Sequence, residues 1–317
     1  MLEIFRSQPA LLIFVAGLVG LIVGSFINVV IHRLPRAWNR DYVDGVAEWA
    51  EVEQANVDRS FAATPAPARQ ALATHLDTIA RSSRAVLQAI PDETLWRPRS
   101  RCPACGHGIT AAQNVPLASF LLLGGKCAAC KTPISLRYPL IELACGLLAA
   151  LIAAKFGMSY QAGAALVLVF WLAPLAMIDA DTTWLPNSCT LPLLWLGLLL
   201  NLFGVFVPLS SAVGGAVAGY LFLAVPSWAY EWLRKVPQAM GRGDFTLMAA
   251  LGAWFGLASI LPIVLVSSVV ALAVALPLLA AGKRDLLTKI PFGPYLACAA
   301  VIYLFHGAAL ARWIDLG

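Results

Sequence analysis

A series of long apolar runs is the feature that most constrains how this chain folds. The runs lie at residues 10–32, 137–157, 162–182, 189–207, 211–233, 245–257, 258–280 and 291–311. Most have the ~20 residues that a helix needs to cross a bilayer. Charged residues make up 12% of the chain, whereas soluble domains carry about 25%. The pattern predicts an all-α polytopic membrane protein with about eight transmembrane helices.

Two of the runs bear on the number of crossings. The run at 245–257 is the shortest, and its length also suits a half-helix, so seven or nine crossings stay open. The first run has no small-residue cleavage site after a short apolar core. It ends in the polar-studded segment Gly24-Ser25-Phe26-Ile27-Asn28, which favours a retained helix over a signal peptide.

The basic residues predict the orientation of the chain. Of 22 Lys and Arg residues, thirteen lie in 33–137, three in 234–242 and three in 283–289. These segments fall on the same side of an eight-crossing arrangement, and an excess of positive charge marks the cytoplasmic side. The net charge of +5 thus reflects topology and contact with anionic membrane lipid. A nucleic-acid partner is not expected, because the basic residues are not interleaved with exposed aromatic residues.

The polar residues divide the chain into three predicted regions. Residues 1–36 form an N-terminal anchor helix that ends at Arg33-Leu34-Pro35-Arg36. Residues 37–136 form a cytoplasmic loop between the first and second crossings. Residues 137–317 form a nearly continuous helical membrane domain.

Two segments are interpreted from composition alone. Residues 41–95 are rich in Ala, Glu, Asp and Arg and are interrupted at Thr64-Pro65-Ala66-Pro67. This composition predicts two short helices or a partly ordered insertion. The small residues at 214–219 predict close helix packing without chemistry, because they let two helix backbones approach each other.

Four cysteines in the loop form two CxxC pairs. Cys102 and Cys105 are followed by Cys127 and Cys130. Four thiolates at this spacing are typical of a tetrahedral zinc site, and a site with no open position is structural. Disulfides or unligated thiols are the alternatives, and a reducing cytoplasm disfavours disulfides. His107 offers a substitute ligand, but a full thiolate set makes it unnecessary. Cys145, Cys189 and Cys298 lie in apolar runs and are expected to pack as buried residues.

Few carboxylates lie in or at the edge of the apolar runs. They are Glu142, Asp179, Asp181, Glu231 and Asp244. Such acids are costly in a membrane and are usually functional. Asp179 and Asp181 are two residues apart, so on a helix they point about 200° away from each other and only one can face Asp244.

Asp244 closes a Gly-x-Gly-Asp motif. Gly241 and Gly243 let the backbone turn tightly and bring the carboxylate close to a neighbour or substrate. Two neighbouring carboxylates share a proton, so one can deprotonate water while the other polarises a carbonyl. The pattern suggests an aspartyl hydrolase, although a solvated acid at a helix end is the alternative for either residue alone.

Six ordered segments carry a resemblance to a known family. They are Gly24–Pro35; Arg99–Cys105 with Asn114–Pro116 and Gly125–Cys130; Ile134–Pro139 with Glu142; Ile178–Asp181 with Leu185–Pro186; Gly241–Phe245 with Leu251–Trp254; and Ile290–Tyr295. Together they span nearly the whole chain, which resembles the bacterial type IV prepilin peptidases. These are membrane aspartyl proteases that also N-methylate their product.

The resemblance implies an activity and a set of site residues. The catalytic pair would be Asp179 and Asp244, with Asp181 the less favoured acid. The substrates would be prepilins and pseudopilins, cut after a Gly at the cytoplasmic face of the bacterial inner membrane. S-adenosylmethionine would supply the methyl group. No glycine-rich loop of the Rossmann type is present, so we place the methyl-donor site at the cysteine loop, near Gly124 and Gly125.

Two positions depart from the family's pattern. Asn187 stands where the family usually has Asp, and Thr246 where it usually has Lys. Loss of a cation beside the two aspartates could alter their charge state or contact with an acidic substrate residue. Two other functions remain open: a peptidase without methylation, and a non-enzymatic zinc-containing membrane assembly factor. The sequence predicts no oligomeric state.

Overall fold

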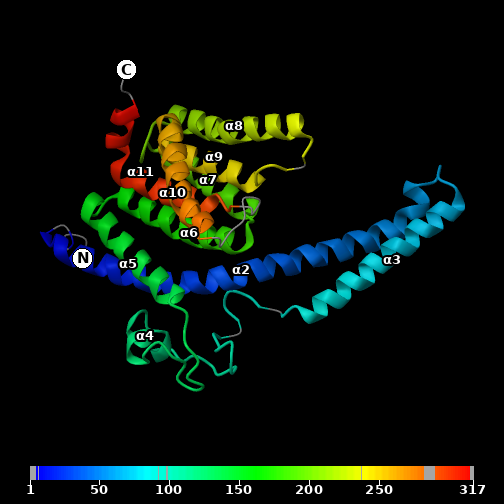
Figure 1. The fold of residues 1–317 in the computed structure, drawn as a ribbon, viewed down its shortest axis with the longest axis horizontal. Coiled ribbons are helices and arrows are strands. Elements are labelled where there is room, and N and C mark those ends of the chain that lie inside the picture. The colour runs from blue at the N-terminus through cyan, green and yellow to red at the C-terminus, as the bar shows by residue number, and fades with distance from the viewer. Residues whose placement is uncertain are drawn as a thin grey trace. The chain divides into compact units, whose positions relative to one another are not determined.

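The computed structural model describes residues 5, 7–91, 93–97, 99–236, 238–281 and 290–314. These residues are mainly helical, and two isolated β-bridges are the only extended pairings among them. The chain divides into two compact units, Met1–Asn28 with Ala111–Gly317, and Val29–Thr110 (Figure 1). The two units are defined by contacts and not by function, so the functional regions 1–36, 37–136 and 137–317 stay a prediction.

The first long helix runs further than the sequence suggested. Helix α2 (Pro9–Ser60) contains Pro35, so the expectation that it ends at 33–36 is wrong. A proline removes a backbone donor, which weakens a helix without always ending it. Residues 37–60 include four Ala and three Glu, which have high intrinsic helix propensity. The helix therefore continues through the proline into the polar segment.

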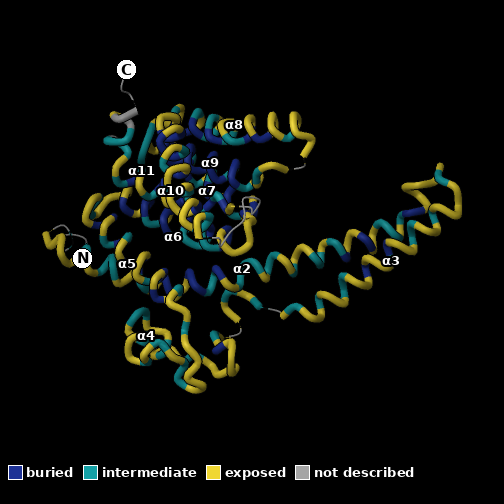
Figure 2. Tube along the Cα trace, viewed as in Figure 1, coloured by how far each residue is buried: buried dark blue, intermediate teal, exposed yellow. Residues whose placement is uncertain are grey.

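The unit Val29–Thr110 is a helical hairpin. The later part of α2 pairs with α3 (Ala66–Ala89), and the chain turns at residues 61–65, next to the predicted break. A small apolar cluster of Ala50, Val57, Leu76 and Ala80 lies between the two helices. Figure 2 shows these few buried positions against mostly exposed helix surfaces. The segment 41–95, predicted as two short helices or a partly ordered insertion, is thus mostly helical, and its helical parts are the end of α2 and the whole of α3.

Arg84 joins the two helices of the hairpin through charge. Its guanidinium donates to Asp44 Oδ1 at 2.6 Å and to Glu51 Oε1 at 2.9 Å. The hydrogen bond from Arg84 holds the pKa of the Glu51 carboxyl below its ordinary value. Both acids lie on α2 and the arginine on α3, so the contact joins the two helices.

The other unit contains the apolar helices. They are α4 (Ala118–Leu122), α5 (Arg137–Phe156), α6 (Tyr160–Thr182), α7 (Asn187–Leu202), α8 (Leu209–Arg234), α9 (Arg242–Phe255), α10 (Ile260–Ala280) and α11 (Gly293–Ile314), with single 3₁₀ turns at Ala112–Asn114 and Leu257–Ser259. Each predicted apolar run coincides with one of these helices or with α2.

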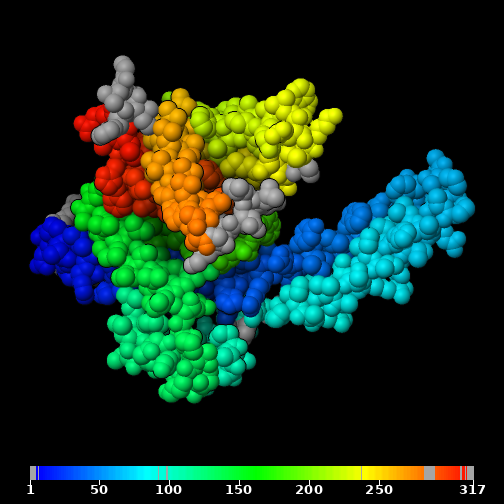
Figure 3. All heavy atoms as spheres, in the orientation of Figure 1, coloured from blue at the N-terminus to red at the C-terminus, as the bar shows by residue number. Residues whose placement is uncertain are grey.

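Five helices in the described part of the chain are long and apolar enough to cross a membrane. They are α2, α5, α6, α8 and the segment Leu257–Ala280 that contains α10. Helices α7 and α11 have shorter apolar stretches. In Figure 3 the atoms of α10 lie on the outside of this unit, and Val269 and Leu272 are exposed, as lipid contact requires. The chain is a multi-pass membrane protein, and the count of eight crossings stays a prediction.

Helix α9 lies at the centre of the apolar unit. It has 14 residues, which gives a length of about 21 Å, less than the ~30 Å of a hydrocarbon core. Nearly all of its side chains are buried, and it lies between α7 and α8 in Figure 1. Trp254 fills the space beside Gly197 of α7 and donates its indole N–H to Leu193 O at 2.8 Å. The short run at 245–257 is therefore a short internal helix.

The glycines of α8 allow its close approach to α9. A Cβ on Gly215 would lie 2.4 Å from Gly252 O, and one on Gly219 would lie 2.6 Å from Met248 O. Backbone therefore meets backbone at this crossing, where no larger residue fits. The prediction that residues 214–219 serve helix packing is confirmed.

Candidate functional site

Asp179 is a buried acid near the C-terminal end of α6. Its side chain is 4% exposed, and its Oδ2 accepts a hydrogen bond from Gly293 N at 2.9 Å. Gly293 is the first residue of α11, so the carboxylate lies at the end of a helix where backbone N–H groups have no intrahelical partner. A Cβ on Gly293 would lie 2.7 Å from Asp179 Oδ2. The glycine is therefore what allows the carboxylate to reach this amide.

Asp244 lies in the first turn of α9 and is 7% exposed. Its Oδ1 is buried and has no hydrogen-bond partner among the described residues. Asp179 is close enough to act on it electrostatically. Buried polar atoms without partners are rare in folded proteins and call for a functional explanation. A substrate or water that reaches the two aspartates would meet a carboxyl oxygen that has no competing hydrogen bond.

Close packing of two segments fixes the position of Asp244. A Cβ on Gly243 would lie 2.2 Å from Leu185 O, so the chain before α7 lies directly against the start of α9. Gly241 has φ −62° and ψ 126°, which any residue adopts. The two glycines were expected to permit a tight turn. Instead, Gly243 is needed for the approach of another backbone, and its neighbour Gly241 leaves space next to Asp244 Oδ2.

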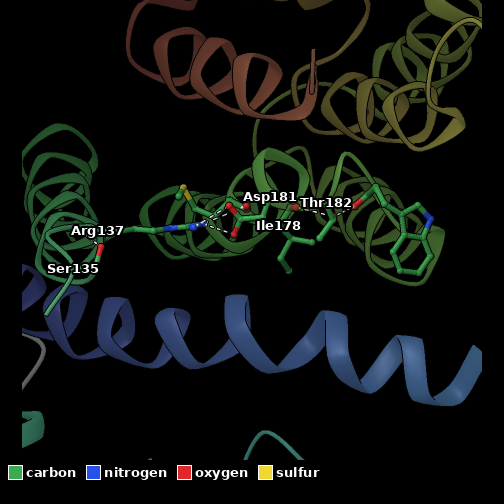
Figure 4. A network of polar contacts seen from close by, with 7 residues as sticks. Ser135, Arg137, Ile178, Asp181 and Thr182 are labelled. Atoms are coloured by element: carbon green, nitrogen blue, oxygen red, sulfur yellow. Dashed lines mark hydrogen bonds and ion pairs between the residues drawn. The ribbon is translucent and has the colours of Figure 1, made fainter. Parts of the chain in front are cut away.

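Asp181 points away from this site, as the helical spacing predicts. Arg137, the first residue of α5, donates to Asp181 Oδ1 at 2.9 Å and to Oδ2 at 2.7 Å. Figure 4 shows this two-pronged contact between the helix ends. Asp181 is exposed and paired with Arg137, while Asp179 is buried beside Asp244. The geometry thus favours Asp179 over Asp181 as the partner of Asp244.

The other two acids of the apolar runs, Glu142 and Glu231, accept hydrogen bonds from backbone amides in loops. Glu142 Oε2 accepts from Leu117 N at 2.9 Å, and Leu117 has a positive φ of 57°. Glu231 Oε1 accepts from Ala239 N at 2.8 Å, within the segment that leads into α9. Neither contact was expected from the sequence, because an acid in an apolar run gives no sign of which backbone amide it will meet.

Three residues that contact the two aspartates or their segments were also missed. They are Leu185, Gly293 and Arg137. Leu185 and Gly293 lie within segments that carry the family resemblance, yet nothing in those segments assigns them a role. The signal for Gly293 is its place after Pro291 and Phe292, where a helix begins.

The four loop cysteines come together. The Sγ atoms of Cys102, Cys105, Cys127 and Cys130 all lie within 4.8 Å of one another. None of the seven cysteines, all within the described residues, forms a disulfide. Each CxxC pair sits in a tight turn, closed by Gly106 N donating to Cys102 O and by Lys131 N donating to Cys127 O. The cluster could hold a zinc ion.

The segment chosen for the methyl-donor site forms a turn after α4. Gly124 and Gly125 have positive φ values of 59° and 67°, and Gly125 N donates to Phe120 O at 2.8 Å. A left-handed conformation explains why glycine is present at both positions. Nothing in this geometry identifies a ligand, so the location stays a prediction.

Comparison with known proteins finds two family models and several relatives. The Bacterial Peptidase A24 N-terminal domain matches residues 18–156, and the Type IV leader peptidase family matches residues 166–276. No solved structure matches the chain.

The relatives are bacterial and match over almost their whole length. A prepilin leader peptidase/N-methyltransferase of Stutzerimonas stutzeri is 44% identical over 96% of this chain and 94% of its own. Proteins of the same name from Pseudomonas aeruginosa and Aeromonas hydrophila are 41% and 39% identical, over 98% and 99% of this chain and 96% and 97% of their own. The chain therefore belongs to the type IV leader peptidase family, among the bacterial prepilin leader peptidase/N-methyltransferases.

Proposed function

We propose that the chain cleaves the leader peptide of type IV prepilins and pseudopilins and then N-methylates the new N-terminal residue. The relatives' shared name and the Type IV leader peptidase match support this reading. The observation that carries the peptidase assignment is the buried Asp244 Oδ1 without a partner, beside Asp179.

The proposed mechanism uses Asp179 and Asp244 as a pair. Two close carboxylates share a proton, because they cannot easily both ionise. Asp179 accepts an N–H from Gly293, which suits the member that carries negative charge and deprotonates water. Asp244 has no donor at Oδ1, which suits the member that carries the proton and polarises the scissile carbonyl. Water is the nucleophile, so no covalent intermediate forms.

The substrate and its surroundings follow from the membrane. The apolar stem of a prepilin would lie among the helices and present the cleavage junction to the pair. The distribution of Lys and Arg supports a cytoplasmic active site on the bacterial inner membrane. Holding the peptide and water in place would supply much of the acceleration.

Zinc and S-adenosylmethionine complete the proposal. The four cysteines supply a full thiolate set, which suits a structural zinc ion that stabilises the loop. S-adenosylmethionine would supply the methyl group to the new amine. We assign the methyltransferase-associated role to the cytoplasmic region 37–136, the anchor to 1–36 and the peptidase to 137–317.

Cleavage of a prepilin by membranes carrying single variants tests the pair. Asp179→Asn and Asp244→Asn are expected to abolish cleavage at unchanged protein level, because each removes the acid–base function. Asp181→Asn keeps most activity, because Asp181 contacts Arg137 instead of Asp244. Loss at 181 in place of 179 would move the pair by two residues.

Further readouts separate the other functions. Full cleavage in all three variants would leave a non-enzymatic membrane assembly factor. Transfer of a labelled methyl group to the mature N-terminus, measured with the wild type, separates the two-activity enzyme from a peptidase without methylation.

A further inference from the structure

Three side chains link the N-terminal part of α7 to that of α9, the helix that carries Asp244. Thr246 Oγ1 lies 2.7 Å from Thr190 Oγ1, 3.1 Å from Asn187 Oδ1 and 2.9 Å from Gly243 O. Thr246 follows Asp244 by two residues, and Asn187 follows Leu185 by two. We call Asn187, Thr190 and Thr246 the polar bridge.

The available protons give the bridge a direction. The Thr246 hydroxyl has one proton, and two of its neighbours, Asn187 Oδ1 and Gly243 O, only accept. The Thr246 hydroxyl therefore donates to these acceptors, and it accepts a hydrogen bond from the Thr190 hydroxyl. Thr190 is fully buried, so its hydroxyl would be left without an acceptor if Thr246 lost its oxygen.

The bridge lies where the position of Asp244 is decided. The Leu185 carbonyl lies against Gly243, directly before Asp244, and the Leu185 side chain lies against Gly293, whose N–H binds Asp179. The hydrogen bonds of the polar bridge add a directional constraint to this packing, because each one is tied to single atoms of α7 and α9.

We propose, on the basis of the peptidase function above, that the polar bridge is a positioning element that holds Asp244 in register with Asp179. The bridge is also neutral. Asn187 and Thr246 contact each other directly, so α7 and α9 are linked at this point without a charge pair.

The first test removes the hydroxyl and keeps the shape. Thr246→Val is expected to lower kcat for prepilin cleavage on the order of tenfold, because a misplaced acid loses alignment with the reacting atoms. The KM for prepilin is expected to stay unchanged, because the proposed role of the bridge is to position Asp244 and not to bind the substrate. Thr246→Ser restores the hydroxyl and most of kcat. Unchanged kcat in Thr246→Val, or a change in KM alone, overturns the proposal.

The second test exchanges the neutral pair for a charged one. Thr246→Lys alone places a cation in the polar bridge, and Asn187→Asp alone places a carboxylate there, so each is expected to reduce cleavage. The double variant N187D/T246K lets the two charges pair, and its rate should exceed the product of the two single effects by about tenfold. A double variant that shows only the product of the single effects overturns the coupling.

Control variants separate this proposal from the peptidase function itself. Ser268→Ala in α10 removes a hydroxyl that donates to Val264 O of its own helix, its one hydrogen bond among the described residues, so its rate should match the wild type. Rates are compared per amount of enzyme in the membrane, which accounts for variants that accumulate poorly. Absence of cleavage by the wild type rejects the function. A wild type that cleaves, with Asp244→Asn inactive and Thr246→Val fully active, rejects the bridge alone.

Discussion

Single glycines set the space around the two aspartates. Gly243 and Gly293 each face an oxygen at a distance that no side chain tolerates, Leu185 O and Asp179 Oδ2 respectively. Both glycines lie at the first turn of a helix. The positions of Asp179 and Asp244 thus depend on residues that have no chemistry of their own.

Replacing Gly243 with alanine should separate the two aspartates. The added methyl would lie 2.2 Å from Leu185 O, so the backbone of α9 must shift. Cleavage is expected to fall about 100-fold, because a shift of about 1 Å in a catalytic group has that effect. Gly214→Ala is the control, since nothing lies within 4 Å of its added Cβ. Equal rates for the two variants would contradict this role of Gly243.

Asn201 provides a test of stability at the residue scale. It is buried, donates to Ala253 O and Trp254 O, and accepts from Phe206 N and Val207 N. Asn201→Leu leaves these four backbone groups without that partner, which costs about 2 kcal/mol or more. A lower midpoint of thermal unfolding in detergent is expected. An unchanged midpoint would mean that the α9 end is held by other contacts.

At the scale of helices, the sequence predicted which elements form but not where the first one ends. Apolar length identified all of the helices in the apolar unit longer than α4, because bilayer thickness imposes that length. Pro35 looked like a helix end, and the good helix formers after it prevailed. The opposed directions of Asp179 and Asp181 were predictable from helix periodicity. Their partners Gly293 and Arg137 were not, because those contacts join segments far apart in the sequence.

The α2–α3 hairpin should loosen in acid. Arg84 bonds Glu51 and lowers its pKa, so this contact contributes at neutral pH and is lost as the pH falls through the lowered value. Amide hydrogen exchange in α3, corrected for intrinsic rates, should therefore speed up in acid. Arg84→Met should show faster exchange already at neutral pH.

Arg81→Met is the matched control for the hairpin. Arg81 pairs with Asp77 on its own helix, so this variant should leave exchange across the hairpin unchanged. Identical exchange in the Arg84 and Arg81 variants would show that the apolar cluster alone holds the two helices together.

At the scale of the whole molecule, zinc content can be measured directly. Purified protein is expected to contain one zinc ion per chain, since four thiolates complete a tetrahedral site. Cys105→Ser or Cys130→Ser should reduce the zinc found by elemental analysis. Cys298→Ser, which changes a cysteine of α11 outside the cluster, should not. Wild-type protein without zinc would return the cluster to unligated thiols.

The sequence predicted more of the site's residues than of its geometry. The CxxC spacing was enough to bring four cysteines together, because the ligands of such a site are close along the chain. The relation of Asp179 to Asp244 instead depends on Leu185, Gly243 and Gly293 packing together. Such packing is a property of the assembled helices, and no local pattern in the sequence specifies it.

The shortness of α9 has a consequence for biogenesis. A segment of 14 residues that begins with an arginine and an aspartate is a poor substrate for insertion by a translocon on its own. Its apolar side chains are covered by α7 and α8 instead of by lipid. Helix α9 must therefore enter the bilayer together with its neighbours. Because Asp244 enters with it, the newly made chain acquires a complete aspartate pair only when these late helices assemble, and a chain stalled before that point carries Asp179 alone.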